Sequence, residues 1–150
     1  MTFNRILILI LFAFAWQTNS FAQVALGKTE NGRASFYSSR FHGKTTSFGE
    51  VHKSTELSAA HRTYPFNTML EVTNLDNDEK VIVRVNDRGP YSKGRLVDVS
   101  KEAAKQLGIV KKGVANVSIR VVGMEGMVLL ERDEEIDPKS GKIISLRIRP

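Results

Sequence analysis

Short runs of alternating apolar and polar residues dominate this chain of 150 residues. "KVIVRVN" and "NVSIRVV" place Val or Ile at every second position, which is the period of a β-strand with one buried face. Six such runs are predicted strands, at 33–38, 56–61, 69–74, 80–86, 95–99 and 116–122. The chain is therefore expected to form a mainly β domain, and its length suffices for one domain with a real core.

The segments between these runs predict one hairpin turn and one helix. "NLDNDE", at 74–79, predicts a turn because Asn and Asp tolerate turn conformations and bond to their own backbone. "SKEAAKQLG" predicts the helix, with Ser100 as N-cap, Ala104 and Leu107 on the buried side and Gly108 at its end.

The beginning of the chain is typical of a secretory signal peptide. Arg5 precedes an apolar run at 6–16, and the small residues Ser20 and Ala22 fit a cleavage site before Gln23. The apolar run is too short to span a bilayer comfortably, although an uncleaved anchor is the alternative. The mature protein is thus expected to be exported and not inserted in the membrane.

The sequence divides into four segments. These are the signal peptide at 1–22, a short linker at 23–31, the β domain at 32–123 and a C-terminal extension at 124–150. In the extension, "MVLLE" and "KIISLRIR" flank an acidic stretch with Asp-Pro and Ser-Gly turn signals. This pattern predicts a second hairpin, with a partly disordered tail as the alternative.

The cysteine content and the net charge limit the classes of function that this sequence can have. The sequence contains no cysteine, so it has no disulfide, no thiol nucleophile and no lipid-attachment site, and the mature protein is expected to be soluble in the periplasm or cell envelope. Export disfavours ATP-dependent chemistry. The net charge of +6 favours an anionic wall surface over nucleic acid as partner, or simply aids solubility.

The stretch "VNDRGPYSKGRLVDVS" places a charged pair on a Gly-Pro corner at the end of a strand. A turn explains Gly89 and Pro90, but it does not explain Asp87 and Arg88. Burial after an apolar strand would raise the pKa of Asp87, whereas the charge of Arg88 would oppose that rise. A salt-bridged strand end is the structural alternative to an active site here.

A long polar loop within 34–66 holds all three histidines of the sequence and is predicted to be functional. Glu50 in this loop and Asp87 are the carboxylates best placed for acid and base chemistry on a glycosidic bond. The histidine spacings match no compact metal motif, and no Ser occupies a Gly-flanked elbow. His61 is a candidate hydrogen-bond partner for a carboxylate or a sugar hydroxyl.

Five motifs at 32–122 occur in order at compatible spacing: "GRASFY", "FHGKTTSFGE", "LSAAHRTYPFNTMLEVTN", "VRVNDRGPY" and "GRLVDVSKEAAKQLG". Together they resemble the rare lipoprotein A (RlpA) family of bacterial lytic transglycosylases. The resemblance implies a six-stranded double-psi β-barrel, shared with expansins, with one or two short helices. It also implies cleavage of the β-1,4 bond between N-acetylmuramic acid and N-acetylglucosamine in peptidoglycan, without cofactor or metal.

In this resemblance the muramyl C6 hydroxyl attacks its own anomeric carbon and leaves a 1,6-anhydro end, preferably on strands without stem peptides. Asp87 matches the acid that protonates the leaving oxygen and then accepts the C6 proton. Glu50 matches a second functional carboxylate, His61 matches a required active-site residue, and Asp98 matches a position interpreted as structural. The substrate contacts implied are Tyr37, Thr45 and Arg88.

The sequence departs from the family in two respects. Many members carry a lipid-attachment Cys and a C-terminal glycan-binding SPOR domain, and this sequence contains neither, so septal targeting is not implied. Two other hypotheses therefore stay open. One is a non-catalytic, expansin-like module that binds or loosens wall polysaccharide, and the other is an interaction domain of a larger envelope assembly. The sequence indicates no particular protein partner.

Overall fold

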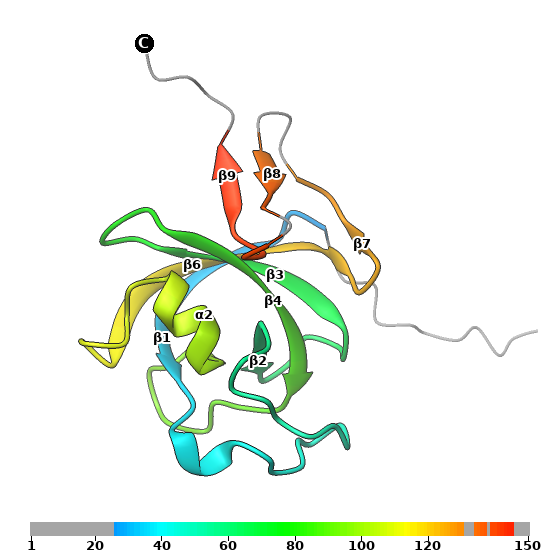
Figure 1. Ribbon diagram of the computed structural model, residues 1–150, viewed down its shortest axis with the longest axis vertical. Coiled ribbons are helices and arrows are strands. Elements are labelled where there is room, and N and C mark those ends of the chain that lie inside the picture. The colour runs from blue at the N-terminus through cyan, green and yellow to red at the C-terminus, as the bar shows by residue number, and fades with distance from the viewer. Residues whose placement is uncertain (1–25, 131–133, 138, 146–150) are drawn as a thin grey trace, which may run out of the picture.

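The structure is a computed structural model that describes residues 26–130, 134–137 and 139–145 (Figure 1). The predicted signal peptide at 1–22 lies outside the described residues. The strands and helices have the bounds β1 (Thr29–Phe36), β2 (Ser58–His61), β3 (Thr68–Asn74), β4 (Lys80–Asp87), β5 (Val97–Val99), β6 (Val114–Met124), β7 (Met127–Val128), β8 (Glu134–Ile136), β9 (Ile143–Ser145), a 3₁₀ helix η1 (Ser39–Phe41) and α2 (Lys101–Gln106). All six predicted strands are present, with ends that differ by a few residues.

The main sheet closes into a six-stranded barrel. The strand order is β1-β5-β2-β4-β3-β6, and β1 also pairs with β6, which joins the two edges. The β1–β5 and β2–β4 pairs are parallel and the others are antiparallel, so the barrel is mixed. Closure removes the free sheet edges and encloses a single core, as the mainly β prediction requires.

The period-two pattern of the sequence corresponds to the inner and outer faces of the barrel. Val81, Val83 and Val85 of β4 are fully buried, as are Val117 and Ile119 of β6. The predicted turn at the end of β3 is also present, because β3 and β4 pair as an antiparallel hairpin across it.

The predicted helix is confirmed as α2. The Ser100 hydroxyl accepts a hydrogen bond of 3.2 Å from the backbone N–H of Ala103, which is the expected N-cap contact. Ala104 and Leu107 are fully buried. Gly108 has a φ of +70°, the left-handed conformation that favours glycine after a helix.

The C-terminal extension contains the predicted hairpin, formed by β8 and β9 (Figure 1). The predicted first strand, "MVLLE", pairs differently, because β7 folds back on β6 instead of pairing with β9. Gly123 permits this approach, since an added Cβ would lie 1.9 Å from the carbonyl oxygen of Met127. The hairpin is docked on the barrel through Ile143, which packs in a small cluster with Ile82 and Val122.

The barrel core makes a prediction about stability. Leu70 in β3 is completely buried, so Leu70→Ala removes apolar contacts and leaves a cavity. We expect it to lower the free energy of unfolding by about 2–5 kcal/mol. Leu75, in the turn after β3, is 49% exposed, and Leu75→Ala is the matched control, with an expected change within about 0.5 kcal/mol. Urea denaturation measures both, and equal effects would contradict the assigned core.

Candidate active site

A β-bulge at the end of β4 decides where Asp87 points. Ala59 of β2 pairs with Val85 of β4, but the next β2 residue, Ala60, pairs with Asp87, so Asn86 is an extra residue in β4. Partners in a ladder face the same side of a sheet, and a bulge redirects the residues that follow it. Asp87 therefore leaves the buried side occupied by Val85 and joins Ala60 on the outer face.

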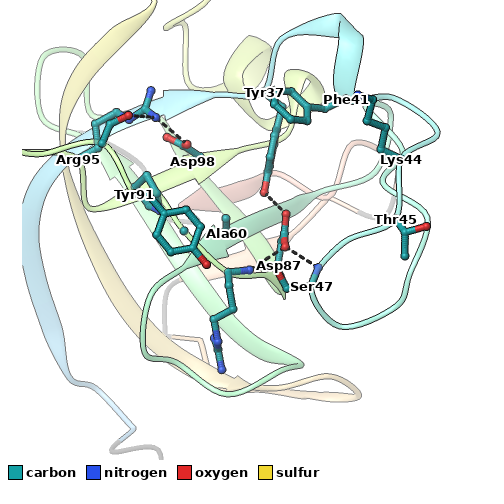
Figure 2. A pocket seen from close by; sticks show the side chains of 14 residues that line it. Tyr37, Phe41, Lys44, Thr45, Ser47, Ala60, Asp87, Tyr91, Arg95 and Asp98 are labelled. Atoms are coloured by element: carbon teal, nitrogen blue, oxygen red, sulfur yellow. Dashed lines mark hydrogen bonds and ion pairs between the residues drawn. The ribbon is translucent and has the colours of Figure 1, made fainter.

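A groove of about 590 Å³ lies on this outer face, across the ends of β4, β2 and β5. Ala60 forms part of its floor and pairs with Asp87 on one side and with Asp98 of β5 on the other. Figure 2 shows Ala60 between these two acidic residues. The volume lies within the range of about 300–1,000 Å³ that is typical of ligand sites.

Three hydrogen-bond donors surround the Asp87 carboxylate (Figure 2). The Tyr37 hydroxyl donates to Oδ2 at 2.8 Å, and the backbone N–H groups of Ser47 and Arg88 each donate to Oδ1 at 2.8 Å. Burial raises the pKa of Asp87, but these hydrogen bonds outweigh it, so the pKa lies below its usual value. The carboxylate is therefore ionised at neutral pH and fixed in position.

Arg88 lowers the Asp87 pKa through its backbone N–H, whereas its guanidinium group is bound elsewhere. The guanidinium donates to the carbonyl oxygens of His61 and Tyr64 and lies over the ring of Phe48, 4.5 Å from the ring centre. Arg88 lines the groove, and its guanidinium holds the loop that follows β2. The side chain thus supports the corner between the two strand ends.

The Gly-Pro corner follows β4, with only Arg88 between them. Gly89 has a φ of +133°, which other residues rarely adopt, and it is followed by a cis peptide bond to Pro90. Both residues line the groove, and the Pro90 carbonyl oxygen accepts a hydrogen bond from Arg62 at 3.2 Å.

Glu50 lies on a small hairpin loop that passes beside Asp87. Thr45 and Val51 form an antiparallel bridge at the base of this loop. The Glu50 carboxylate binds the guanidinium of Arg84 at 3.0 and 2.8 Å and the amide of Asn86 at 3.2 Å. The hydrogen bond from Arg84 is the main cause of a lowered pKa of Glu50.

These contacts attach the loop to the outer face of β4. Ser47, on the same loop, donates its N–H to Asp87, so the ion pair of Glu50 indirectly positions that donor. Glu50 is not among the described residues that line the groove. The geometry therefore favours a positioning role for Glu50 over direct contact with substrate.

His61 also lies outside the described lining of the groove, because it faces the buried side of β2. It pairs with Val97 and is 3% exposed. Its Nδ1 accepts hydrogen bonds from the backbone N–H groups of Thr63 and Tyr64 at 3.3 and 3.1 Å, and its ring stacks on Tyr64. Burial lowers the pKa of His61 to about 4, so the ring is neutral at pH 7 and organises the loop after β2.

Comparison with known proteins identifies the family. A family model described as "Lytic transglycolase" matches residues 29–119. A protein of Campylobacter jejuni named endolytic peptidoglycan transglycosylase RlpA is 51% identical over 100 residues, covering 67% of this chain and 36% of that protein. This chain belongs to the RlpA family. The RlpA protein of Helicobacter pylori is 41% identical over 122 residues, covering 81% of this chain and 39% of that protein.

The chain spans less than half the length of these RlpA relatives. Among solved structures, an expansin of Clavibacter michiganensis matches with a TM-score of 0.52 and 26% identity, over 63% of this chain and 50% of the expansin. The Streptomyces papain inhibitor matches with a TM-score of 0.54 and 19% identity, over 65% of this chain and 97% of the inhibitor. The second likeness concerns the fold alone.

All three substrate-contact residues expected from the RlpA resemblance, Tyr37, Thr45 and Arg88, line the groove. Tyr37 points its hydroxyl at Asp87, while the preceding Phe36 packs against the barrel core. Thr45 is exposed on the loop beside the groove (Figure 2). Tyr37 therefore both lines the groove and donates a hydrogen bond to Asp87.

Sequence reasoning missed several residues that line the groove, among them Ser47, Tyr91 and Asp98. The Ser47 donor is a backbone N–H, which has no side-chain signature. Tyr91 is 83% exposed at the groove and follows Pro90 directly, so the "GPY" motif could have indicated it. Asp98 was interpreted as structural, although its place between Val97 and Val99 predicts an outward side chain.

Two features are absent from the described parts of the chain. They contain no group of three His, Cys, Asp or Glu side chains arranged to hold a metal ion. Within the same ranges, no helix has the length and hydropathy needed to cross a membrane.

The hydrogen bonds of Asp87 predict the effect of Tyr37→Phe. This change removes one donor to the carboxylate, so the pKa of Asp87 should rise toward its usual value of 3.8. Carbon-13 NMR titration of the carboxyl group measures this. Tyr91→Phe is the matched control and should leave the Asp87 titration unchanged. An unaltered Asp87 pKa in Tyr37→Phe would show that the hydroxyl does not stabilise the ionised form.

The loop contacts predict the effect of Glu50→Ala. Loss of the Arg84 ion pair should let the loop open more often and speed hydrogen exchange of the Ser47 amide several-fold, which corresponds to about 1 kcal/mol for a partly exposed pair. Glu56→Ala, which removes the exposed pair with Lys53, is the control and should not change that amide. Equal exchange in both variants would refute the positioning role of Glu50.

Proposed function

We propose that this chain is a peptidoglycan lytic transglycosylase that cleaves the β-1,4 bond between N-acetylmuramic acid and N-acetylglucosamine and leaves 1,6-anhydro ends. The observation that carries the proposal is the Asp87 carboxylate, which three donors hold on the floor of a glycan-sized groove. The match to relatives named as endolytic peptidoglycan transglycosylases supports the substrate and the reaction.

The reaction requires two proton transfers at one sugar linkage. A proton must reach the leaving glycosidic oxygen, and the C6 hydroxyl must lose its proton as its oxygen attacks the anomeric carbon. Asp87 is ionised and fixed in place, which suits the acceptance of the C6 proton. Its fixed position matters because a small displacement of an acid–base group is costly in rate.

The walls of the groove suit a carbohydrate. Tyr91 is almost fully exposed, and Phe41 also lines the groove, so aromatic faces are available to pack on sugar rings. Thr45 and Ser47 add polar groups that can bond sugar hydroxyls. Ala60 on the floor has a small side chain and leaves room for a ring.

The substrate form and the place of action follow from the same resemblance. We propose that glycan strands without stem peptides are preferred, as in the RlpA family. The signal-like sequence at 1–22 and the absence of cysteine support action in the periplasm or cell envelope without a lipid anchor. The net charge of +6 favours attraction to an anionic wall.

A non-catalytic, expansin-like module is the second candidate, and the match to the Clavibacter expansin favours it. The same groove and aromatic residues would bind polysaccharide without cleavage. Three donors focused on one carboxylate are more than such a module needs, because sugar binding does not require an ionised acid held at a single position. The enzyme is therefore the first candidate.

Mass spectrometry of reaction products tests the proposal. Purified protein incubated with peptide-stripped peptidoglycan should release fragments with 1,6-anhydro ends, and less from intact peptidoglycan. Asp87→Asn should lower the rate at least about 100-fold with the melting temperature retained, because the acid–base group is lost. Asp76→Asn, in an exposed turn, is the matched control and should keep full activity.

Other products would lead to other conclusions. Reducing ends would mean that water is the nucleophile, so the protein would be a hydrolase. Glycan binding without any product would support the expansin-like module. Full activity of Asp87→Asn would refute the role of Asp87.

A further inference from the structure

The groove contains a second carboxyl group that the reaction described above does not use. We infer that Asp98 is the proton donor to the leaving glycosidic oxygen, and that Asp87 is the partner that accepts the C6 proton. This inference rests on the proposed function and deepens it, because it divides the two proton transfers between two residues of one groove.

The fold places Asp98 in the groove by strand alternation. Its neighbours Val97 and Val99 are fully buried in the core, so Asp98 faces outward. Ala60 pairs with both Asp98 and Asp87, and all three line the groove. The two acidic residues are thus two strand spacings apart, about 10 Å between α-carbons, which leaves room for one sugar linkage between their side chains.

The surroundings of Asp98 differ from those of Asp87. Asp98 Oδ2 has one ion pair, with Arg95 at 3.2 Å, and its side chain is only 15% exposed. Asp98 Oδ1 is buried and has no hydrogen-bond partner among the described residues. A buried carboxylate oxygen without a donor destabilises the ionised form and favours the protonated acid.

The two carboxyl groups therefore differ in acidity. Burial raises the pKa of Asp98, and the charge of Arg95 opposes this only in part. At Asp87 the hydrogen-bond donors outweigh burial and lower the pKa. Two titratable groups whose surroundings push their pKa values apart are the arrangement that an acid and base pair needs.

Other charged and titratable groups also line the groove. Those that line it, apart from Asp87 and Asp98, are Tyr37, Lys44, Arg88, Tyr91 and Arg95. The Arg88 guanidinium donates to the carbonyl oxygens of His61 and Tyr64, and Tyr37 donates to Asp87. Arg95 is the cation that the structure pairs with Asp98, and it also donates to the Ser92 hydroxyl at 2.8 Å.

These two residues account for both protons that the reaction transfers. As the bond between the anomeric carbon and the bridging oxygen breaks, Asp98 gives its proton to that oxygen and becomes a carboxylate. The C6 oxygen forms the new bond to the anomeric carbon, and its proton passes to Asp87. One proton then moves from Asp87 to Asp98 through solvent, which restores both groups and consumes no water.

The pH dependence of turnover tests the assignment. For the wild type, kcat/KM should fall at low pH as Asp87 is protonated and at high pH as Asp98 ionises. Asp98→Asn should lose at least about 100-fold in kcat and also lose the high-pH fall, with glycan affinity within about twofold of the wild type. Asp76→Asn again serves as the matched carboxylate control.

Arg95→Met separates a proton donor from a merely structural residue. It keeps Asp98 but removes the positive charge that lowers its pKa, so the high-pH fall should move to higher pH. If Asp98 only supported the fold, Arg95→Met would lower the rate without shifting the high-pH fall of kcat/KM. The variant also provides a test if Asp98→Asn does not fold.

Carbon-13 NMR titration of the wild type gives a readout independent of turnover, and Asp98 should titrate at higher pH than Asp87. The inverse order would overturn the inference whatever the activity. If Asp98→Asn retains wild-type activity, or if the high-pH fall of kcat/KM does not move in Arg95→Met, the inference is overturned and the proposed function stays intact. Absence of anhydro products from the wild type would overturn the proposed function and the inference with it.

Discussion

A single extra residue in β4, opposite the step from Ala59 to Ala60 in β2, turns the end of this strand from the core to the outer face. Without it, Asp87 would continue the buried series of Val83 and Val85, where an ionised carboxylate without water is very costly. With it, Asp87 meets donors from Tyr37, Ser47 and the adjacent Arg88, and the groove acquires its charged floor. The Gly89-Pro90 corner, the loop that carries Ser47 and strand β5 all border the groove to which this bulge turns Asp87.

The strands could be predicted from the sequence because burial imposes a period of two, and the helix because Ser100 and Gly108 mark its ends. The groove was less predictable. A bulge leaves no residue-type signal, and the Ser47 donor is a backbone group. The role of Asp87 was predictable because a charged residue on a Gly-Pro corner is unusual. That of Asp98 was not, because polar residues between two valines are common in strands with one exposed face.

The site residues divide by the face of the sheet on which they lie. Asp87 and Asp98 are on the outer face, in the groove, while His61 is beneath it and Glu50 beside it. A neutral, hydrogen-bonded histidine and an ion-paired glutamate are well suited to hold loops and poorly suited to transfer protons. Sequence motifs place all four in one family pattern, but in the structure they lie in different surroundings.

The strand order determines at which stage of folding the groove can form. The residues around Asp87 come from the end of β1, the loop before β2, the end of β4 and β5, and β1 pairs with β5 and β6, which lie far from it in the sequence. Such non-local pairings form late, because chain entropy must be lost before they are made. A chain that is still unfolded, or only half assembled, therefore contains none of the constellation. The groove and its carboxylates therefore arise together, in one step with the completed fold.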